Sequence, residues 1–581
     1  MQNFTWMIGG EAGFGIMTTG LAFAKMATRL GYNIFDYVEY PSLIRGGHNA
    51  YEVHVSEQDL THLAPVIDVL TCLNKETYEK HKNRLTKESF VVYDGAEFEF
   101  DNNVKKISVP FRKILTDLKG QAVMRNTIAM AATLAVIGTP IEVFLDIIKE
   151  QFARKGDEVV NFNVQFAKAG YDHVKNNYTN TASWMVKRET VEPKMVMTGN
   201  DAFALGAVIA DCRFYCAYPM TPSSTVLTTL AAWANKVGMV VRHAEDEISV
   251  VNTAIGASFA GARSAVGSSG GGFALMVESL SFSGVTEIPL VVFVAQRPGP
   301  ATGMPTWTEQ GDLLFAVHAG HGEFPKIVLA PGTVSEMIEM TATAFNLADV
   351  YQLPVVVLSD MYLSEGHKSI AKKFVTELTA KYKVDRGAYL EALAPDLSDP
   401  AKKSKSFARY RITDNGISPR LVPGNPGYFY QANSYEHLED GHTTEDAEPR
   451  IAQVDKRSRK IAAYLEKDFV APMVYGDLDA AETVFVSWGS SLGAITETQK
   501  QLNGKGFKTA HIHFTYLYPM NRDRITPFFS KPKKYVLVEN NSTGQLGKLL
   551  LSETGVEIKE KILRYDGRPL TAEYIISKLN K

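Results

Sequence analysis

The hydrophobic and polar positions of the chain alternate in a way that predicts strands followed by helices along most of its length. An apolar run near the start, FTWMIGG, ends in glycines, and an amphipathic stretch then leads to a second glycine and a second apolar run. This order of strand, turn, helix and strand is typical of α/β proteins. The same order resumes near Met195 and near Thr483, so we predict an α/β fold class with three α/β domains.

The domain boundaries follow from shifts in this pattern. We expect a first domain over residues 1–180, a second over 195–372 and a third, smaller one over 468–581, with a polar linker after the first. Residues 373–467 are charged and rich in proline, glycine and tyrosine, and their hydrophobic periodicity is weak. A stretch of this length without clear elements predicts an irregular arm that serves an interface.

Composition narrows the class of protein. The chain has 581 residues, of which 45% are hydrophobic and 22% charged, enough for several full-sized cores. A net charge of −3 without a basic stripe argues against nucleic-acid binding. The sequence has no apolar run of about 18 residues, so we expect no membrane span. The first residues do not resemble a signal peptide, so we expect a cytoplasmic protein.

The three cysteines are too few for a disulfide framework. Cys212 and Cys216 are spaced C-x3-C, and with no third cysteine nearby we interpret them as buried apolar residues rather than cluster ligands. The chain itself is therefore predicted to hold no metal.

Two glycine loops near the N-terminus are candidate anion sites. The stretch GGEAGFG, residues 9–15, lies between a predicted strand and the start of a helix, where backbone amides and the helix dipole can bind phosphate. A simple tight turn explains this stretch equally well. The stretch PSLIRGGH follows the next strand and adds a cation beside the same face. The candidate residues are Gly10, Gly13, Gly15, Arg45, Gly46 and Gly47.

Two further stretches only superficially resemble phosphate or magnesium motifs. GSSGGGFALM, residues 267–276, lacks the G-K-[ST] ending of a triphosphate loop, so its glycines predict close approach of a ligand or a facing subunit. The stretch around Asp94 lacks the spacing of a magnesium–diphosphate motif and is interpreted as a turn.

The stretch HAEDEISVVNTAIGASFAGAR places acidic residues where a strand ends and a helix of small, apolar residues begins. Glu245 and Asp246 could simply cap that helix. Glu247 falls in its first turn, where a buried charge is costly without a partner, so it is a candidate for proton chemistry. The stretch FYCAYPMTPSS, residues 214–224, is either an over-determined turn or a place where hydroxyl groups face a ligand.

Five stretches, in this order, resemble the α subunit of 2-oxoacid:ferredoxin oxidoreductases: YPMTPSS, EDEISVVNTAIGASFAGAR, VAQRPGPATGMPTWTEQGDL, GHTTEDAEP and VENNSTGQLG. The N-terminal stretches GGEAGFGIMTTG and YPSLIRGGHNAYEVHVS resemble the γ subunit of the same family, fused upstream. The fusion and the GPATGMPTWTEQGDL stretch most resemble the 2-oxoglutarate enzymes. Pyruvate and branched-chain 2-oxoacids remain alternatives.

This resemblance implies a γ-like domain, a thiamine pyrimidine-binding domain and a transketolase C-terminal-like domain. It implies an enzyme that converts a 2-oxoacid, coenzyme A and oxidised ferredoxin to an acyl-CoA, carbon dioxide and reduced ferredoxin. Thiamine diphosphate would be shared with a separate β subunit that carries Mg²⁺ and a [4Fe–4S] cluster, and an (αβ)₂ heterotetramer is expected. A non-catalytic scaffold that binds coenzyme A or a nucleotide is the alternative of another class.

The resemblance also implies roles for single residues. Glu247 matches the glutamate that shares a proton with the thiamine pyrimidine, with Glu245 as the alternative. Thr221 and Arg297 match the substrate-holding threonine and arginine, and Tyr218 and Pro219 lie in the same cofactor turn. For a distal substrate carboxylate the candidates are Thr306, Thr308 and Arg411. His437 and His442 are interpreted as part of a solvated acidic arm rather than metal ligands.

Overall fold

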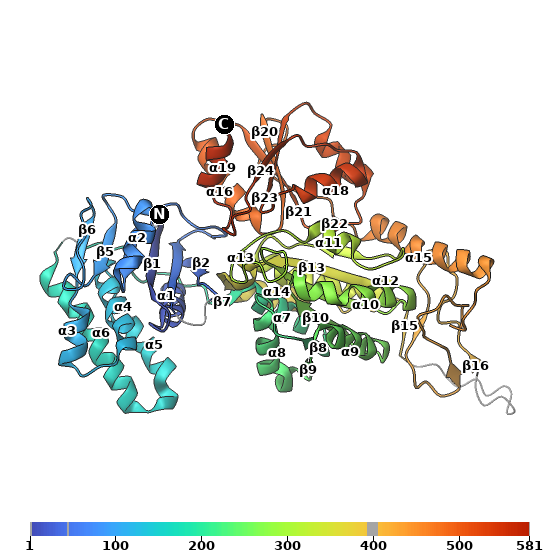
Figure 1. The fold of residues 1–581 in the computed structure, drawn as a ribbon, viewed down its shortest axis with the longest axis horizontal. Coiled ribbons are helices and arrows are strands. Elements are labelled where there is room, and N and C mark those ends of the chain that lie inside the picture. The colour runs from blue at the N-terminus through green and yellow to red at the C-terminus, as the bar shows by residue number, and fades with distance from the viewer. Residues whose placement is uncertain (1–2, 43–45, 180, 392–404, 580–581) are drawn as a thin grey trace. The chain divides into compact units, whose positions relative to one another are not determined.

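The computed structural model describes residues 3–42, 46–179, 181–391 and 405–579, and Figure 1 shows their helices and strands. The chain forms two compact units. Unit 1 comprises residues 1–198, 365–377 and 571–574, and unit 2 comprises residues 199–364, 378–570 and 575–581. Within the described ranges, no helix is long and apolar enough to cross a membrane. The predicted α/β class is confirmed by sheets that are rich in parallel strands and connected through helices.

Unit 1 is built on an eight-stranded sheet with the order β6-β5-β4-β1-β3-β2-β14-β7. Its strands are β1 (Asn3–Glu11), β2 (Asn33–Glu39), β3 (His48–Ser56), β4 (Val69–Cys72), β5 (Phe90–Tyr93), β6 (Lys105–Ser108), β7 (Lys194–Thr198) and β14 (His367–Ala371). Its helices are α1 (Ile16–Arg29), α2 (Lys75–His81), α3 (Phe111–Asp117), α4 (Arg125–Val136), α5 (Glu142–Phe152) and α6 (Asp157–Asn177). Helix α4 is apolar around most of its circumference, and residues 128–136 are accordingly all buried.

Strands β7 and β14 are far apart in the sequence but pair with each other and join this sheet beside β2. Polar contacts support the junction, since the Lys368 Nζ donates to both carboxylate oxygens of Asp59 at 2.7 and 2.6 Å. The sequence interpretation placed both strands in the domain at 195–372. It did not anticipate their pairing here, because antiparallel pairing of distant segments leaves no local periodic signal. The predicted domain boundaries stay predictions.

Unit 2 contains a seven-stranded sheet with the order β22-β12-β13-β11-β10-β8-β9, parallel except for β22. Its strands are β8 (Phe214–Ala217), β9 (Val240–His243), β10 (Ser264–Ser268), β11 (Leu290–Gln296), β12 (Ile327–Leu329), β13 (Pro354–Asp360) and β22 (Tyr516–Tyr518). Its helices are α7 (Gly199–Ile209), α8 (Ser224–Val237), α9 (Glu247–Phe259), α10 (Gly270–Thr286), α11 (Leu313–His318) and α12 (Val334–Tyr351). The order of strands and helices predicted to resume near Met195 is confirmed over residues 194–296.

A five-stranded sheet with the order β19-β21-β20-β23-β24 forms the last part of unit 2. Its strands are β19 (Met473–Tyr475), β20 (Thr483–Trp488), β21 (Thr509–Phe514), β23 (Lys534–Glu539) and β24 (Glu560–Leu563), and its helices are α16 (Leu492–Gly504), α17 (Arg522–Ile525) and α18 (Gln545–Thr554). Helices α13 (Met361–Glu365), α14 (Lys372–Lys381) and α19 (Ala572–Leu579) contain points at which the chain passes from one unit to the other.

The arm, residues 373–467, is less irregular than its sequence predicts. It contains short strands, β15 (Tyr389–Leu390), β16 (Lys405–Ser406), β17 (Arg420–Leu421) and β18 (Tyr428–Phe429), and a 21-residue helix, α15 (Ala447–Lys467), which is labelled in Figure 1. The prediction of an irregular segment is therefore wrong for residues 447–467. Apart from Tyr464, the buried residues of α15 are polar or charged, so the helix lacks the apolar periodicity that reveals most amphipathic helices.

Buried ion pairs fix the arm to the rest of unit 2. The Glu287 carboxylate, at the C-terminus of α10, pairs with Lys456 and Lys460 of α15, and all three side chains are fully buried. The Asp349 carboxylate of α12 similarly binds Arg263, Arg386 and Arg420 at 2.7 to 3.1 Å. Buried charged residues thus form the contact between the arm and the rest of unit 2, where sequence interpretation expects apolar residues.

A pair of histidines lies in the core of the five-stranded sheet. The Ser487 Oγ is 2.8 Å from His511 Nε2 and 3.2 Å from His513 Nδ1. The other nitrogen of each ring is buried without a partner among the described residues. Burial lowers the pKa of His511 well below its usual range and that of His513 to about 3, so both rings are neutral in the folded protein.

These histidines predict acid sensitivity. Unfolding would return each histidine pKa to about 6.5. Below that pH the unfolded state therefore binds protons that the folded state does not bind. Stability should therefore fall on acidification by up to about 1.4 kcal/mol per histidine per pH unit. We expect a lower urea midpoint at about pH 5 than at about pH 7.5, and a weaker pH dependence in His513→Gln. The exposed His442 provides the control, because His442→Gln should keep the wild-type dependence; equal slopes in all three proteins would contradict the prediction.

Candidate functional site

The predicted site residues of unit 2 come together at the carboxyl ends of the seven-stranded sheet. Strands β8, β10 and β11 lie side by side and run parallel, so the turns that follow them emerge at one edge. The turn after β8 carries Thr221, and Arg297 follows β11 directly. Arg297 Nη1 donates to the Thr221 carbonyl oxygen at 2.8 Å. Burial lowers the pKa of this guanidinium from its usual value, as expected for a cation that is partly withdrawn from water.

The turn after β8 is stabilised by hydrogen bonds from a buried residue of α7 that sequence interpretation missed. Asn200, fully buried in the first turn of α7, donates to the Pro222 carbonyl at 2.6 Å and to Thr225 Oγ1 at 2.7 Å. The Ser223 hydroxyl donates to the Met220 carbonyl and is used within the turn. The polar GND sequence before an otherwise apolar helix was the only available signal for Asn200.

Other residues of the same turn are accessible to solvent. Tyr218 is 38% exposed, Pro219 is exposed, and Thr221 is half-buried. No side chain or carbonyl of the described residues binds the Thr221 hydroxyl. The turn therefore offers a free hydroxyl group beside a guanidinium, an arrangement that can bind a carboxylate.

The three acidic residues that precede α9 separate into different roles. Asp246 is the N-cap of α9 and its carboxylate accepts from the Ser249 amide at 2.8 Å, which confirms the capping interpretation. Glu245 is exposed and accepts from the Ser249 hydroxyl. Glu247 is only 3% exposed, and its Oε1 is buried without a hydrogen-bond partner among the described residues. An unpaired buried carboxyl oxygen is costly, so this group is poised for a donor from outside the chain.

The glycines at the start of α10 make room for this carboxyl group. A Cβ on Gly272 would lie 2.4 Å from Glu247 Oε1 and 2.0 Å from Ser268 Oγ. A Cβ on Gly271 would meet only the Ala301 carbonyl, at 3.9 Å, so the space there is open. The hydroxyl groups of Ser268 and Ser269 are also buried without partners in the part of the chain that the structure describes. Packing around Glu247 accounts for Gly272, whereas the predicted approach of a ligand or a facing subunit along GSSGGG stays a prediction.

Two carboxyl groups beyond the predicted set lie near this helix start. Asp312 would be 2.4 Å from a Cβ on Gly270, and burial raises its pKa to about 6. Burial, together with the charge of Asp312, raises the pKa of Glu309 to about 7. Both groups can therefore exchange protons near neutral pH. Sequence interpretation missed them because acidic residues in a loop usually face solvent.

The three candidates for a distal carboxylate have different surroundings. The Thr308 hydroxyl donates to Asp360 Oδ1 at 3.2 Å and accepts from the Tyr362 amide, so it serves the core. Arg411 is an exposed residue of the arm. The Thr306 hydroxyl is buried and has no partner among the residues described, which leaves it as the candidate with a free donor.

The glycine loops of unit 1 form their own candidate site. Gly13 and Gly46 adopt φ angles of 95° and 74°, and a Cβ at either would meet nothing within 4 Å. Gly15, also left-handed, is the N-cap of α1 and packs against Asn126. The Ala12 amide donates to the Gly47 carbonyl at 3.3 Å, which joins the two loops.

The other two residues predicted for this site add less. Gly10 is packed against Leu73 and Phe14 rather than facing open space. Arg45 lies outside the described residues.

The remaining sequence features are structural. Cys212 and Cys216 are buried, as predicted, and burial raises their thiol pKa values to about 12 and about 11. Asp94 closes a turn by accepting from the Ala96 amide, again as predicted. His437 is buried, not solvated, and its ring packs on Tyr410 at 4.0 Å, whereas His442 is exposed. Within the described ranges, no three acidic, histidine or cysteine residues are arranged to hold a metal ion.

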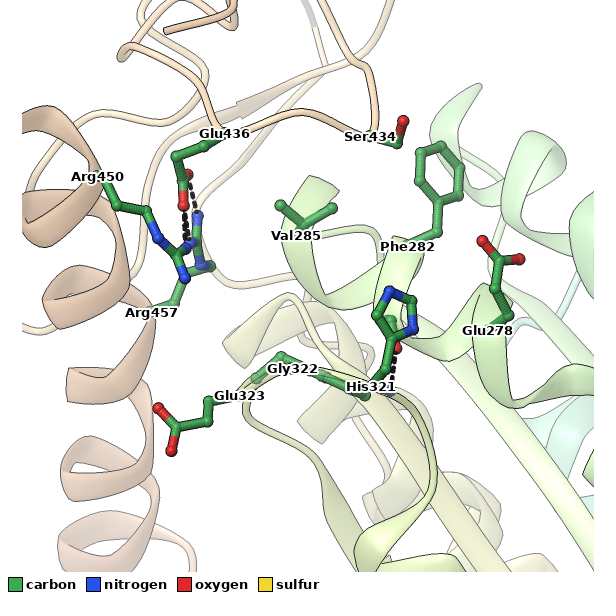
Figure 2. A pocket seen from close by; sticks show the side chains of 12 residues that line it. Glu278, Phe282, Val285, His321, Gly322, Glu323, Ser434, Glu436, Arg450 and Arg457 are labelled. Carbon is green, nitrogen blue, oxygen red and sulfur yellow. Dashed lines mark hydrogen bonds and ion pairs between the residues drawn. The ribbon is translucent and has the colours of Figure 1, made fainter. Parts of the chain in front are cut away.

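A cavity elsewhere in unit 2 contains none of the predicted site residues. Figure 2 shows it between α10, the loop at 321–324 and the arm, and its volume is about 350 Å³. Its two arginines, Arg450 and Arg457, both bind the carboxylate of Glu436. Both guanidinium groups thus share one carboxylate, and the acidic side chains of Glu278 and Glu323 also line the cavity.

The sequence matches two protein-family models. Residues 205–456 match "Pyruvate flavodoxin/ferredoxin oxidoreductase, thiamine diP-bdg", a range that includes Thr221, Glu247 and Arg297. Residues 5–173 match "Pyruvate ferredoxin/flavodoxin oxidoreductase". Together these ranges include both candidate sites.

Similar proteins extend over the whole chain. The 2-oxoacid:ferredoxin oxidoreductase subunit alpha of Saccharolobus solfataricus is 30% identical over 99% of this chain and 97% of its own length. The 2-oxoglutarate oxidoreductase subunit KorA of Mycobacterium tuberculosis is 27% identical over 96% of this chain and 88% of its own. The solved structure of 2-oxoglutarate:ferredoxin oxidoreductase from Magnetococcus marinus, with 2-oxoglutarate, coenzyme A and succinyl-CoA bound, is 29% identical, covers 100% of this chain and 99% of that one, and has a TM-score of 0.91.

Proposed function

This chain belongs to the family of 2-oxoacid:ferredoxin oxidoreductase alpha subunits, and we propose that it acts on 2-oxoglutarate, which is converted with coenzyme A and oxidised ferredoxin to succinyl-CoA, carbon dioxide and reduced ferredoxin. The reaction could run in either direction with a low-potential ferredoxin. The observation that carries the proposal is the buried carboxyl oxygen of Glu247, unpartnered among the described residues, at the same sheet edge as the Arg297 and Thr221 pair. The full-length likeness to an enzyme solved with 2-oxoglutarate supports the choice of substrate.

The residues around Glu247 fit the pyrimidine half of thiamine diphosphate. A buried acceptor without a donor among the described residues needs a polar ligand group, and at Gly271 nearby the nearest atom to an added Cβ is the Ala301 carbonyl oxygen at 3.9 Å. When bound there, thiamine diphosphate would supply a carbon nucleophile and an electron sink for the decarboxylation of a 2-oxoacid. Glu247 would hold a proton shared with the pyrimidine nitrogen N1′, and Tyr218 and Pro219 would line the same ring.

The guanidinium of Arg297 and the hydroxyl group of Thr221 would hold the carboxylate next to the reacting carbonyl. A partly buried guanidinium binds carboxylate more strongly than an exposed one, because less water competes. Thr306 is our candidate for the distal carboxylate of 2-oxoglutarate, since its hydroxyl group is buried and unpartnered among the described residues.

Arg297→Lys is expected to raise the KM for 2-oxoglutarate about tenfold or more, with a smaller effect on kcat, because lysine keeps the charge but loses the two-pronged geometry. Steady-state kinetics of the assembled enzyme measure both constants. Arg213→Lys is the control, since Arg213 precedes β8 at the opposite end of the strand. An unchanged KM in the Arg297 variant would remove this residue from the substrate site.

We propose that a β subunit completes the site with the diphosphate-binding half, Mg²⁺ and a [4Fe–4S] cluster, in an (αβ)₂ assembly that reduces ferredoxin. Large apolar side chains are exposed on the turn after β8 and on helices α9 and α10: Tyr218, Ile248 and Leu275. Such exposure is typical of a surface that a partner covers. In unit 1, the glycine loops that include Gly13, Gly15, Gly46 and Gly47 are proposed to contact coenzyme A, with Arg45 as a phosphate ligand.

The test is viologen reduction by the chain co-purified with its native partner, in the presence of thiamine diphosphate and coenzyme A. Faster turnover with 2-oxoglutarate than with pyruvate or branched-chain 2-oxoacids would support the proposal. A preference for one of the other substrates would keep the reaction but change its substrate. Turnover with none of them would favour a non-catalytic scaffold that binds coenzyme A or a nucleotide.

A further inference from the structure

The loop at residues 297–312, which begins at Arg297, is fastened to the five-stranded sheet at its far end. Gln310 is fully buried. Its backbone amide donates to the Asn540 backbone carbonyl at 2.7 Å, and its side-chain Oε1 accepts from the Asn540 backbone amide at 3.0 Å. Its Nε2 donates to the Trp488 carbonyl at 2.9 Å. Every polar atom of this side chain is therefore used in holding the loop.

The VENNSTGQLG stretch supplies the other half of this fastening. Asn541 Nδ2 donates to the Gln310 carbonyl at 3.1 Å, and Gln545 Nε2 donates to the Gly311 carbonyl at 2.6 Å. The buried Glu539 accepts from Trp488 Nε1 at 3.1 Å and from Asn541 Nδ2 at 2.6 Å, which orients the asparagine. A fully satisfied buried network of this kind specifies one conformation.

A second fastening point lies three residues earlier in the loop. The Arg568 guanidinium lies 3.3 Å from the centre of the Trp307 ring, a cation–π contact. The Gly567 carbonyl accepts from the Thr308 amide at 3.2 Å, and a Cβ on Gly567 would lie 3.0 Å from Met304 and 3.2 Å from Trp307. We call residues 539–545 and 565–569 together the clamp.

Residues of the loop on either side of these anchors lie near the candidate site. The Ala301 carbonyl lies 3.9 Å from the position of a Cβ on Gly271, and Asp312 lies over Gly270. The loop also carries the Thr306 hydroxyl, which has no hydrogen-bond partner among the described residues. Arg297 and Thr221, in contrast, are positioned by strands β11 and β8 and do not contact the clamp in the described structure.

We propose that the clamp fixes the 297–312 loop in the conformation that selects the length of the 2-oxoacid, with Arg568 as a positioning residue that acts through Trp307. This inference rests on the proposed function. The carboxylate beside the reacting carbonyl is held by residues outside the clamp, so the clamped loop is left to contact the remainder of the substrate. A loosened loop should lower selectivity for a five-carbon substrate over a three-carbon one while retaining turnover of the shorter acid.

The experiment compares Arg568→Ala, Arg568→Lys and wild type in the assembled enzyme. In Arg568→Ala we expect faster hydrogen exchange over residues 300–312 and a roughly tenfold lower kcat/KM for 2-oxoglutarate, mainly through KM, with pyruvate affected much less. Arg568→Lys should recover most of both effects, because an ammonium group also binds an aromatic face. Arg524→Ala is the matched control, since Arg524 lies over Phe469 in the same unit and away from the loop.

The two readouts separate the possible failures. Unchanged exchange over residues 300–312 in Arg568→Ala would overturn the clamp, whatever the activity. Faster exchange with equal losses for both substrates would overturn its role in selectivity. If the wild type turns over no 2-oxoacid, the proposed function and the selectivity role fail, while hydrogen exchange alone still decides whether the clamp holds the loop.

Discussion

Replacing Glu247 by glutamine is expected to lower turnover of the assembled enzyme by about 10²- to 10⁴-fold without preventing assembly, which is the range that general acid–base groups contribute. Glutamine has nearly the same shape, so it should fit beside Gly272 as the carboxyl group does. It cannot share a proton with a ring nitrogen as a carboxyl group can. Viologen reduction with saturating thiamine diphosphate measures the rate, and size-exclusion chromatography with the partner chain measures assembly.

The matched control for this prediction is Glu245→Gln. Glu245 stands two positions earlier and is exposed, and its only described bond is to the Ser249 hydroxyl. It should keep close to wild-type turnover. If the two variants were affected to the same degree, or if Glu247→Gln kept full activity, the assignment of proton chemistry to Glu247 would be wrong.

Much of this site could be predicted because its candidate residues lie in short, recognisable sequence stretches. Glu247 stood out as an acidic residue in the first turn of a small-residue helix, and the structure buries it there. Thr221 and Arg297 follow strands of one parallel sheet, and parallel strands bring such residues together. Their roles were assigned from the family resemblance.

What sequence interpretation missed depends on partners that are distant in the chain. Asn200 and Gln310 each look like ordinary polar residues until the turn or the loop that they bind is known. The helix α15 was missed because its buried face carries Lys456 and Lys460, which a hydrophobic pattern assigns to solvent. Pattern rules assume apolar cores, so they fail where a buried carboxylate makes a lysine face the interior.

Glu287→Gln is expected to destabilise unit 2 by about 3–5 kcal/mol, the usual cost of removing one partner from a buried ion pair. Burial alone would raise the pKa of Glu287, but the attraction of Lys456, Lys460 and Arg409 outweighs this and lowers it. The carboxylate is thus charged, and burial lowers the pKa of both lysines while Glu287 opposes that shift. Without Glu287 the cations face one another in the core. Urea unfolding of the purified protein measures the loss.

A rescue experiment separates loss of charge compensation from loss of packing. Lys460→Met added to Glu287→Gln should recover part of the stability, because it removes an unpaired buried cation and leaves an apolar chain of similar length. The defect of the single variant should also shrink as pH rises, since a lysine whose folded pKa is depressed favours the folded state once it can lose its proton. Asp479→Asn, at an exposed pair with Lys531, is the control and should leave the urea midpoint unchanged. A Glu287→Gln protein as stable as wild type at neutral pH would show that the arm is held by something other than these charges.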